Sequence, residues 1–256
     1  MLKNAQHRAV LTSSTGGDGT LPKGFPKGLV FLCSLLILLT FLLLPDSSAF
    51  AAEESDYPVK ITAKMPFVDL PGCDGGKNFR LEREQDIDNQ VDFDFSYTSR
   101  KCPPYCVQPM TLSPGVETIG ELEMIHYLKK MAQEDGSLLV IDSRTDFWLA
   151  KGMIPCAISI PWTDLHYRKA DKEKLMDILE FQFGVVKEED LLNFENAKTL
   201  VFYCNGYWCG QSPTNIRSLL MLGYPAHKLK WYRGGMQAWS SLGFDTIPHP
   251  DMQKEE

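Results

Sequence analysis

The stretch FYCNGYWCGQSPT, residues 202–214, places a cysteine between the pattern of a strand and the pattern of a helix. The apolar run at 199–203 predicts a buried strand that ends at Cys204. An apolar-periodic run then predicts a helix, with Ser212 as its cap and Pro213 at its first position. The free N–H groups of a first helical turn favour an anion, so Cys204 is expected to have a lowered pKa and to be a nucleophilic thiolate. The alternative is an unreactive apolar cysteine at the end of a buried strand.

The composition of the whole chain is that of a globular protein. Its 256 residues have room for one or two domains, and 44% hydrophobic with 23% charged content is ordinary for a protein with one sizeable core. A formal net charge of −7 argues against nucleic acid as the main partner, because neutralising phosphates requires a basic face.

Residues 1–51 have the pattern of a targeting segment. Basic residues precede the apolar run 29–44, and the small-x-small pattern at 49–51 is typical of a signal peptidase site. The apolar run is shorter than the roughly 20 residues of a spanning helix, so we expect export to the periplasm with cleavage near Ala51. The alternative is an uncleaved inner-membrane anchor through 29–44. In both cases the rest of the chain lies outside the cytoplasm and meets the membrane only through this segment.

The predicted export determines how the cysteines are interpreted. Cys33 lies in the targeting segment, and an even number remains, which in an oxidising compartment favours disulfides over free thiols or zinc. The remaining cysteines are Cys73, Cys102, Cys106, Cys156, Cys204 and Cys209. The histidines show no ligand spacing, so neither a metal nor a cofactor is expected.

Residues 52–115 are acidic in patches and rich in turn residues, and we expect an extension packed on the main domain. Short strands are predicted at 59–63 and 91–97, where polar and apolar residues alternate. The sharpest feature is the sequence CPPYC from Cys102 to Cys106, whose two prolines stiffen the backbone between the sulfurs. A local disulfide or two separate bridges is one interpretation, and a redox pair facing the Cys204 loop is the other.

Residues 116–247 alternate between strand and helix patterns, and 248–256 form a tail. Helices are predicted at 121–131 and 175–181, with a short helix or turn at 147–149 and a further helix at 189–193; strands are predicted at 138–141, 157–160 and 199–203. This order predicts an α/β domain with a mostly parallel central sheet and helices on both faces. Such sheets bind ligands at the carboxyl ends of their strands, which is where Cys204 lies.

Three ordered motifs resemble those of rhodanese-like sulfurtransferases. The sequence LVIDSRTDFWLAKGMIPCAISIP at 139–161 is similar to the family's early motif, and the loop at Cys204 matches the place of its catalytic loop. The residues at 222–224 and 230–235 look like its closing motif. The resemblance covers about residues 118–247 and implies the rhodanese-like fold.

The resemblance also implies a mechanism in two half-reactions. Cys204 would attack the outer sulfur of a donor, hold it as a persulfide within a ring of loop amides, and pass it to a thiol-bearing small molecule or protein. The loop residues implied in binding are Asn205, Gly206, Tyr207, Trp208, Gly210, Gln211 and Ser212. Asp142 and Arg144 are expected to tie strand ends to neighbouring loops, with a catalytic role as the alternative.

The chain departs from the family pattern in ways that concern the substrate. The family's loop usually carries basic residues that bind an anionic donor, whereas this loop is neutral and aromatic, so thiosulfate is expected to be a poor donor. Met153 and Cys156 replace the usual His and Gly of the early motif. Tyr207 and Trp208 are either pocket walls or residues that pack against the extension.

Cys209 leads to alternative functions. It could resolve a persulfide or a sulfenic acid by forming a disulfide with Cys204, or it could be a structural half-cystine or a core thiol. The first hypothesis is therefore an exported sulfurtransferase, the second a periplasmic thiol-disulfide redox protein, and the third a catalytically quiet binding module. The export signal, CPPYC and CGQSP also resemble an exported branch associated with quinoprotein alcohol oxidation.

Overall fold

The computed structural model describes residues 58–102, 105–133, 136–189 and 191–249. The predicted targeting segment and nearly all of the predicted tail lie outside these residues. Among the helices that are described, none is long and apolar enough to cross a membrane.

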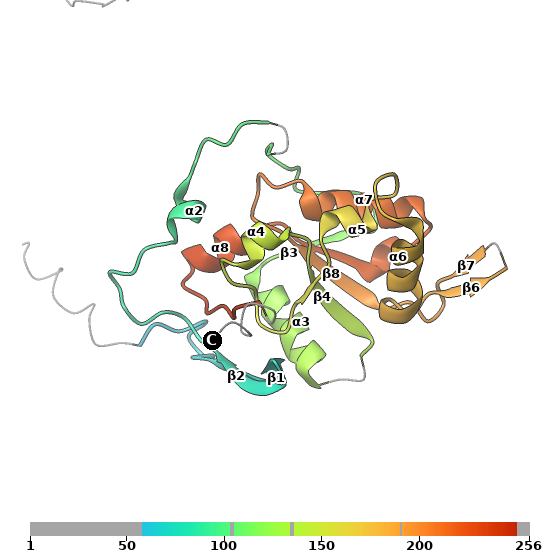
Figure 1. The fold of residues 1–256 in the computed structure, drawn as a ribbon. Coiled ribbons are helices and arrows are strands. Elements are labelled where there is room, and N and C mark those ends of the chain that lie inside the picture. Colours follow the sequence, from blue (N-terminus) through green and yellow to red (C-terminus); the bar gives the residue numbers. More distant parts are fainter. Residues whose placement is uncertain (1–57, 103–104, 134–135, 190, 250–256) are drawn as a thin grey trace, which may run out of the picture. The chain divides into compact units, whose positions relative to one another are not determined.

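A sheet of five parallel strands forms the centre of the described region, in the order β3-β9-β8-β4-β5 (Figure 1). The strands are β3 Glu117–Ile119, β4 Leu138–Asp142, β5 Ile158–Ser159, β8 Thr199–Tyr203 and β9 Leu229–Tyr232. In the register of the sheet, Phe202 pairs with Ile141 on one side and with Trp231 on the other. The prediction of a parallel α/β sheet is confirmed, and β8 lies at its centre.

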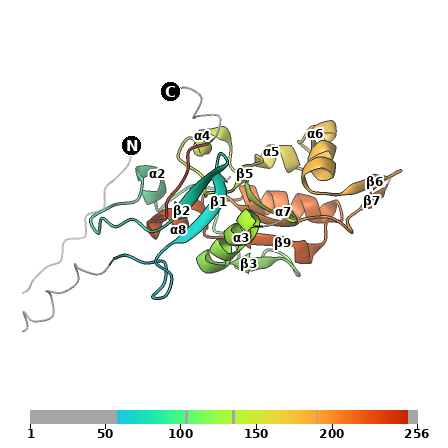
Figure 2. The same ribbon diagram turned by 90° about the horizontal axis from the view of Figure 1, so that it is seen from below.

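Alternate residues of β8 face two different hydrophobic clusters. Leu200 and Phe202 pack with the helices of one face, and Val201 and Tyr203 pack with those of the other. The first face is covered by α5 Trp162–Leu165, α6 Lys172–Asp177, the π-helical turn η2 Ile178–Gln182 and α7 Gln211–Met221. The second is covered by α3 Glu121–Gln133, α4 Asp146–Leu149 and α8 Gly235–Ser241 (Figure 2). The 3-10 turn η3 Ala226–Lys228 precedes β9.

The residues before the sheet form a hairpin and a short helix. The strands β1 Val68–Asp74 and β2 Lys77–Leu81 pair antiparallel, and α2 is Phe93–Ser96. The predicted strands at 59–63 and 91–97 are wrong. The hairpin instead lies at 68–81, where Gly75 and Gly76, both at positive φ, form the turn. Residues 93–96 form a helix because Asp92 accepts a hydrogen bond from the Asp94 N–H at its start. Buried Leu70 and Leu81 share a hydrophobic cluster with residues of α3.

Two further element predictions need correction. The predicted helix at 189–193 is wrong, because β6 Val186–Glu188 and β7 Leu191–Asn193 form a hairpin in which Glu189 has a φ of 53°. The predicted helix at 175–181 begins earlier, where Asp171 accepts a hydrogen bond from the Lys174 N–H, and its second half is the π-helical turn.

A disulfide joins Cys73 of β1 to Cys156, with a Cα–Cα distance of 4.2 Å. Cys156 has a φ of 67°, a left-handed conformation that favours glycine. This explains why the resembling motif usually has a Gly there. In this chain the cysteine occupies the same backbone conformation and links the hairpin to the loop before β5.

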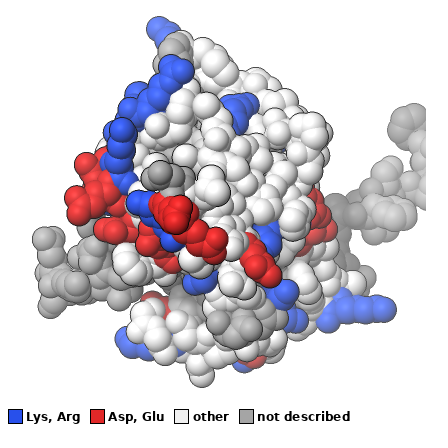
Figure 3. Space-filling view, turned by 90° about the vertical axis from the view of Figure 1, so that its right-hand side faces the viewer, with Lys and Arg blue, Asp and Glu red and all other residues white. Residues whose placement is uncertain are grey.

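The space-filling view in Figure 3 shows the face that lies to the right in Figure 1. Acidic and basic side chains occur together on this face, with uncharged surface between them.

Candidate active site

Cys204 lies directly after β8, at the carboxyl end of the central strand, and only 2% of it is exposed. Hydrogen bonding by the backbone N–H groups of Gly206 and Ser212 acts to lower the pKa of its thiol. The end of strand β8 therefore places the sulfur beside the start of α7, where free N–H groups favour an anion.

Ser212 has a different role from the predicted one. Helix α7 begins at Gln211 with Gly210 as its N-cap, so the predictions of Ser212 as the cap and Pro213 at the first position are wrong. The Ser212 hydroxyl instead donates to Cys204 Sγ at 3.1 Å and accepts from Trp231 Nε1 at 3.2 Å. Because the sulfur lies beside the first turn, the hydroxyl donates its hydrogen bond to the sulfur and does not cap the helix backbone.

The two cysteines of the loop have opposite acidities. Burial acts to raise the pKa of Cys204, but hydrogen bonds from the Cys209 thiol, the Ser212 hydroxyl and the two N–H groups outweigh it and lower the pKa. Burial raises the pKa of Cys209, and its hydrogen bond to the neighbouring Cys204 sulfur raises it further. Cys204 is thus the more acidic of the two cysteines.

Helix α8 holds the loop from the other side. The N–H of Met236 donates to the Cys204 carbonyl at 3.0 Å, and the N–H of Gln237 donates to the Asn205 carbonyl at 2.9 Å. Gly235 has a φ of 55°, and a Cβ at this position would overlap the Cys204 carbonyl oxygen. The closing motif and the cysteine loop are therefore packed backbone to backbone.

The polar residues of the loop surround Cys209. Asn205 is fully buried, its Nδ2 lies 4.0 Å from Cys209 Sγ, and its Oδ1 has no hydrogen-bond partner among the described residues. Gln211 Oε1 accepts from Cys209 Sγ at 3.5 Å. The Gly206 carbonyl accepts a hydrogen bond from the Cys209 N–H at 2.9 Å, which closes the loop.

The aromatic residues of the loop contact the extension. Trp208 packs edge-on against Tyr105, with 4.8 Å between the ring centroids, and the guanidinium of Arg100 lies 4.0 Å from the Trp208 ring centroid. The guanidinium of Arg233 lies 4.9 Å from the ring centroid of Tyr207. Sequence reasoning missed both arginines, because neither belongs to the loop motif and no spacing links them to it.

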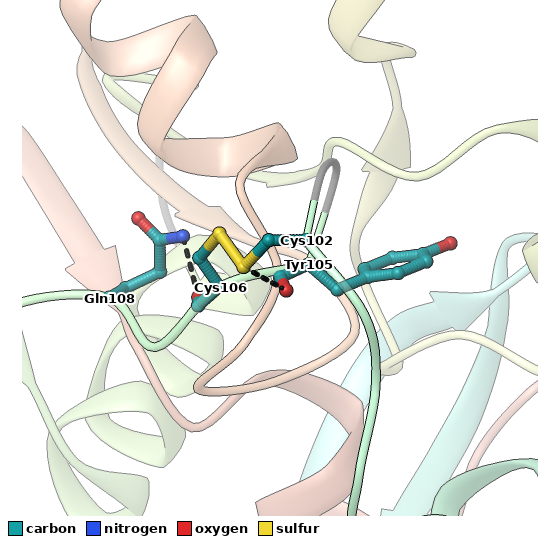
Figure 4. Close-up of a disulfide and its surroundings, with 4 residues drawn as sticks. All are labelled: Cys102, Tyr105, Cys106 and Gln108. Carbon is teal, nitrogen blue, oxygen red and sulfur yellow. Dashed lines mark hydrogen bonds between the residues drawn. A yellow bond between two sulfur atoms is a disulfide. The ribbon is translucent and has the colours of Figure 1, made fainter. Parts of the chain in front are cut away.

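The extension also reaches the loop through its backbone. Tyr105 and Cys209 form an isolated antiparallel bridge, and the Gln108 N–H donates to the Tyr207 carbonyl at 2.9 Å. Next to this bridge, Cys102 and Cys106 form a disulfide with a Cα–Cα distance of 5.2 Å. Figure 4 shows the ring of Tyr105 pointing away from that disulfide, while Gln108 donates to the Cys106 carbonyl.

Asp142 and Arg144 form a fully buried ion pair at the carboxyl end of β4. The guanidinium donates to both carboxylate oxygens and also to the carbonyls of Trp148 at 3.1 Å and Gly152 at 2.6 Å. These bonds tie the strand end to the loop after α4.

The described residues contain no group of three or more His, Cys, Asp or Glu side chains placed to hold a metal ion.

Comparison with known proteins identifies the central part of the chain. The model of the family described as rhodanese-like domain matches residues 124–242. No curated protein matches the sequence. Similar solved structures include a rhodanese-related protein from Thermoplasma volcanium, 19% identical over 52% of this chain and 99% of that chain, with a TM-score of 0.32. A human single-domain sulfurtransferase is 18% identical over 49% and 96%, with a TM-score of 0.31. Residues 124–242 of this chain form a rhodanese-like domain.

Proposed function

We propose that the protein is an exported sulfurtransferase that forms a persulfide on Cys204 and passes the outer sulfur to a thiol acceptor. The observation that supports this most directly is the Ser212 hydroxyl, which donates to the Cys204 sulfur at 3.1 Å and helps to lower the pKa of this buried cysteine. Groups that stabilise a thiolate can also stabilise the terminal anion of a persulfide that grows from it.

Both half-reactions are exchanges at sulfur. The Cys204 thiolate attacks the outer sulfur of a donor persulfide, the bond between the two donor sulfurs breaks, and the donor leaves as a thiolate. An acceptor thiolate then attacks the outer sulfur on Cys204, which restores the Cys204 thiolate and produces a persulfide on the acceptor. No net oxidant or reductant is consumed.

The proposed donor is a persulfide carried by a small thiol or a protein, and thiosulfate is expected to be poor. Arg233, near the loop, donates to the carbonyls of Gln108 and Pro109. Arg100 donates to the Asp94 carbonyl through Nη2, while its buried Nε has no hydrogen-bond partner among the described residues. Because Cys204 is 2% exposed, a donor reaches the sulfur only after the loop or the extension moves.

The proposal is tested by exposing the reduced protein to a low-molecular-weight persulfide and measuring the Cys204 peptide by mass spectrometry. We expect the peptide to gain the mass of one sulfur atom in the unmodified chain and in Cys209→Ser. Cys204→Ser should gain none. If no donor adds sulfur to Cys204 in a folded protein, the proposal fails.

A second candidate function is thiol-disulfide exchange by Cys204 and Cys209. The contact between the two residues favours it, because Cys204 Sγ donates to the Cys209 carbonyl at 3.6 Å and Cys209 acts to lower the pKa of Cys204. Oxidation followed by peptide mapping should then show a bond between these two cysteines, and trapping that never finds this bond would exclude this function. A binding module without catalysis would instead keep its cellular role in Cys204→Ser.

The proposal also includes the compartment of the protein and the process that it serves. We place the domain in the periplasm, with residues 29–44 as signal or anchor, and a quinoprotein oxidation system as the process that it serves. Cell fractionation should recover the protein outside the cytoplasm, with the membrane fraction distinguishing the anchor from the cleaved signal.

A further inference from the structure

We propose that a cavity beside the cysteine loop binds the zwitterionic α-amino-acid group of a small thiol, such as cysteine. The cavity would thereby select the acceptor of the proposed sulfur transfer. The substrate class rests on the proposed function, whereas binding at the cavity is measurable without any sulfur transfer.

The cavity lies at the carboxyl ends of β3 and β9. Its volume is about 200 Å³, and its walls include Ile119 of β3, Arg233 directly after β9 and Tyr207 of the cysteine loop. Met110 and Tyr207 are exposed, so the cavity opens to solvent. Pockets for drug-sized ligands have about 300–1,000 Å³, so this one suits a ligand the size of a single amino acid. Parallel sheets bind their ligands at this end of the strands.

Two opposite charges line the cavity without pairing with each other. Glu121, the first residue of α3, and Arg233 both form its walls, and the ion pairs of the described residues include none between them. Glu121 Oε1 accepts from the Tyr232 hydroxyl at 3.2 Å, and Arg233 Nη2 donates to the Gln108 carbonyl at 2.7 Å. Within the described part of the chain, Glu121 Oε2 and Arg233 Nη1 have no hydrogen bond. Both side chains are therefore held in place with a charged group left for a ligand.

Tyr207 connects this cavity to the loop that carries Cys204. A Cβ at Gly234 would lie 3.3 Å from Glu121 Oε1 and 3.4 Å from the Tyr207 hydroxyl, so both oxygens lie at the same wall. The guanidinium of Arg233 lies 4.9 Å from the Tyr207 ring centroid. Tyr207 thus lies beside both charged side chains. A ligand in the cavity therefore contacts the loop that must move before a thiol reaches Cys204.

The separated charges complement an α-amino acid. Its ammonium group can donate to Glu121 and to the Tyr207 hydroxyl, and its carboxylate can accept from Arg233, in charge-assisted hydrogen bonds. A thiol with only one of these charges leaves the other side chain without a partner. A dianion such as thiosulfate meets the Glu121 carboxylate as well as the guanidinium, which agrees with its expected weakness as a donor.

The first experiment measures binding with S-methylcysteine, which has the amino-acid group but no thiol to exchange. The full chain purified in detergent and its Cys204→Ser variant are titrated by calorimetry. We expect both to bind the probe, and we expect N-acetylation or methyl esterification of the probe to weaken binding about tenfold, because each removes a charge-assisted hydrogen bond. No saturable binding, or equal binding of the blocked probes, would overturn the site.

Variants test the role of Glu121 in this binding. Glu121→Gln keeps an oxygen for the Tyr232 hydroxyl but loses the charge, so it should bind S-methylcysteine about tenfold more weakly. N-acetylation of the probe should then have no further effect, while esterification should still weaken binding, a pattern that a general disturbance of the fold does not produce. Glu173→Gln is the matched control, because Glu173 is exposed on α6, on the other face of the sheet, and its affinity should not change. An unchanged affinity in Glu121→Gln would overturn the site.

The last experiment connects binding to transfer. Cys204 is loaded with sulfur and mixed with cysteine or with 3-mercaptopropionate, which lacks the ammonium group, and mass spectrometry follows the loss of the added sulfur. The ratio of the two rates should fall about tenfold in Glu121→Gln, and comparing ratios cancels the intrinsic reactivities of the thiols. An unchanged ratio would overturn the selection of the acceptor. If Cys204 never gains sulfur, the proposed function fails while the binding of S-methylcysteine still stands, so the two failures are distinguishable.

Discussion

Among single residues, Ser212 has the most direct effect on the reactivity of Cys204. Ser212→Ala removes the hydroxyl that donates to the sulfur, so the pKa of Cys204 should rise and its alkylation profile should move to higher pH. A hydrogen bond to a charged group contributes about 1.5–3 kcal/mol, so alkylation at neutral pH should slow about tenfold or more. The rate of iodoacetamide labelling of Cys204 against pH measures this.

Ser241→Ala is the matched control for this change, since its hydroxyl donates to the Ala238 carbonyl within α8 and touches neither cysteine. Trp231→Phe, which removes the N–H that donates to Ser212, should shift the profile in the same direction by less. An unchanged profile in Ser212→Ala would mean that backbone donors alone set the acidity of Cys204.

The buried pair of Asp142 and Arg144 predicts a large effect on stability. Arg144→Met leaves the Asp142 carboxylate buried without its charged partner, which should lower the free energy of unfolding by about 3–5 kcal/mol. Urea unfolding measures the loss. As a control, Arg80→Met breaks the exposed ion pair with Asp69 and should lower the free energy of unfolding by at most about 1 kcal/mol. Asp142→Leu/Arg144→Met should recover part of the loss, and a double variant no better than the single one would contradict this account.

At the level of secondary-structure elements, the contact between α8 and the cysteine loop makes a specific prediction. In Gly235→Ala the new Cβ would overlap the Cys204 carbonyl and the Gly206 nitrogen, so the loop must shift and persulfide formation on Cys204 should fall strongly. Gly76→Ala is the matched control, because Gly76 also has a positive φ but a Cβ there meets no atom within 4 Å. The control should lose only about 1–2 kcal/mol of stability from backbone strain and keep its reactivity. Equal reactivity in both variants would show that the contact does not shape the site.

The elements of the sheet could be predicted from sequence, and those of the extension could not. The runs at 138–141 and 199–203 are continuous apolar stretches buried on both faces, which is a strong local signal. The hairpin of β1 and β2 depends instead on the turn at Gly75 and Gly76 and on packing against α3, neither of which alternation of residues reveals. The short hairpin at 186–193 was missed for a different reason. Its strands are mostly exposed, so they lack the apolar pattern of a buried strand.

For the molecule as a whole, the position of Cys204 was predictable but its surroundings were not. The order of strand, cysteine and helix fixed its place at the end of β8. The N–H groups of α8 that donate to the loop, and the contact of Tyr105 with it, come from segments far apart in the sequence. No local pattern encodes such contacts, and only the assembled fold brings them together.

The disulfide between Cys73 and Cys156 joins the extension to the domain and should contribute more to stability than Cys102–Cys106. It closes a loop with a sequence separation of 83, against 4 for the other bond, and chain entropy in the unfolded state predicts about 4–5 kcal/mol for the longer loop and about 2 kcal/mol for the shorter. Chemical unfolding of Cys73→Ala/Cys156→Ala and Cys102→Ala/Cys106→Ala compares them. A larger loss in the second pair would contradict the prediction.

The backbone at Cys156 allows the effect of the cross-link to be separated from strain. Since φ is 67° there, Cys73→Ala/Cys156→Gly should be more stable than Cys73→Ala/Cys156→Ala by about 1–2 kcal/mol, the cost of a left-handed conformation for a residue with a Cβ. Both variants lack the bond, so their difference reports only the backbone. Equal stability would mean that the loop before β5 relaxes once the bond is lost, and that the disulfide itself holds Cys156 in its left-handed conformation.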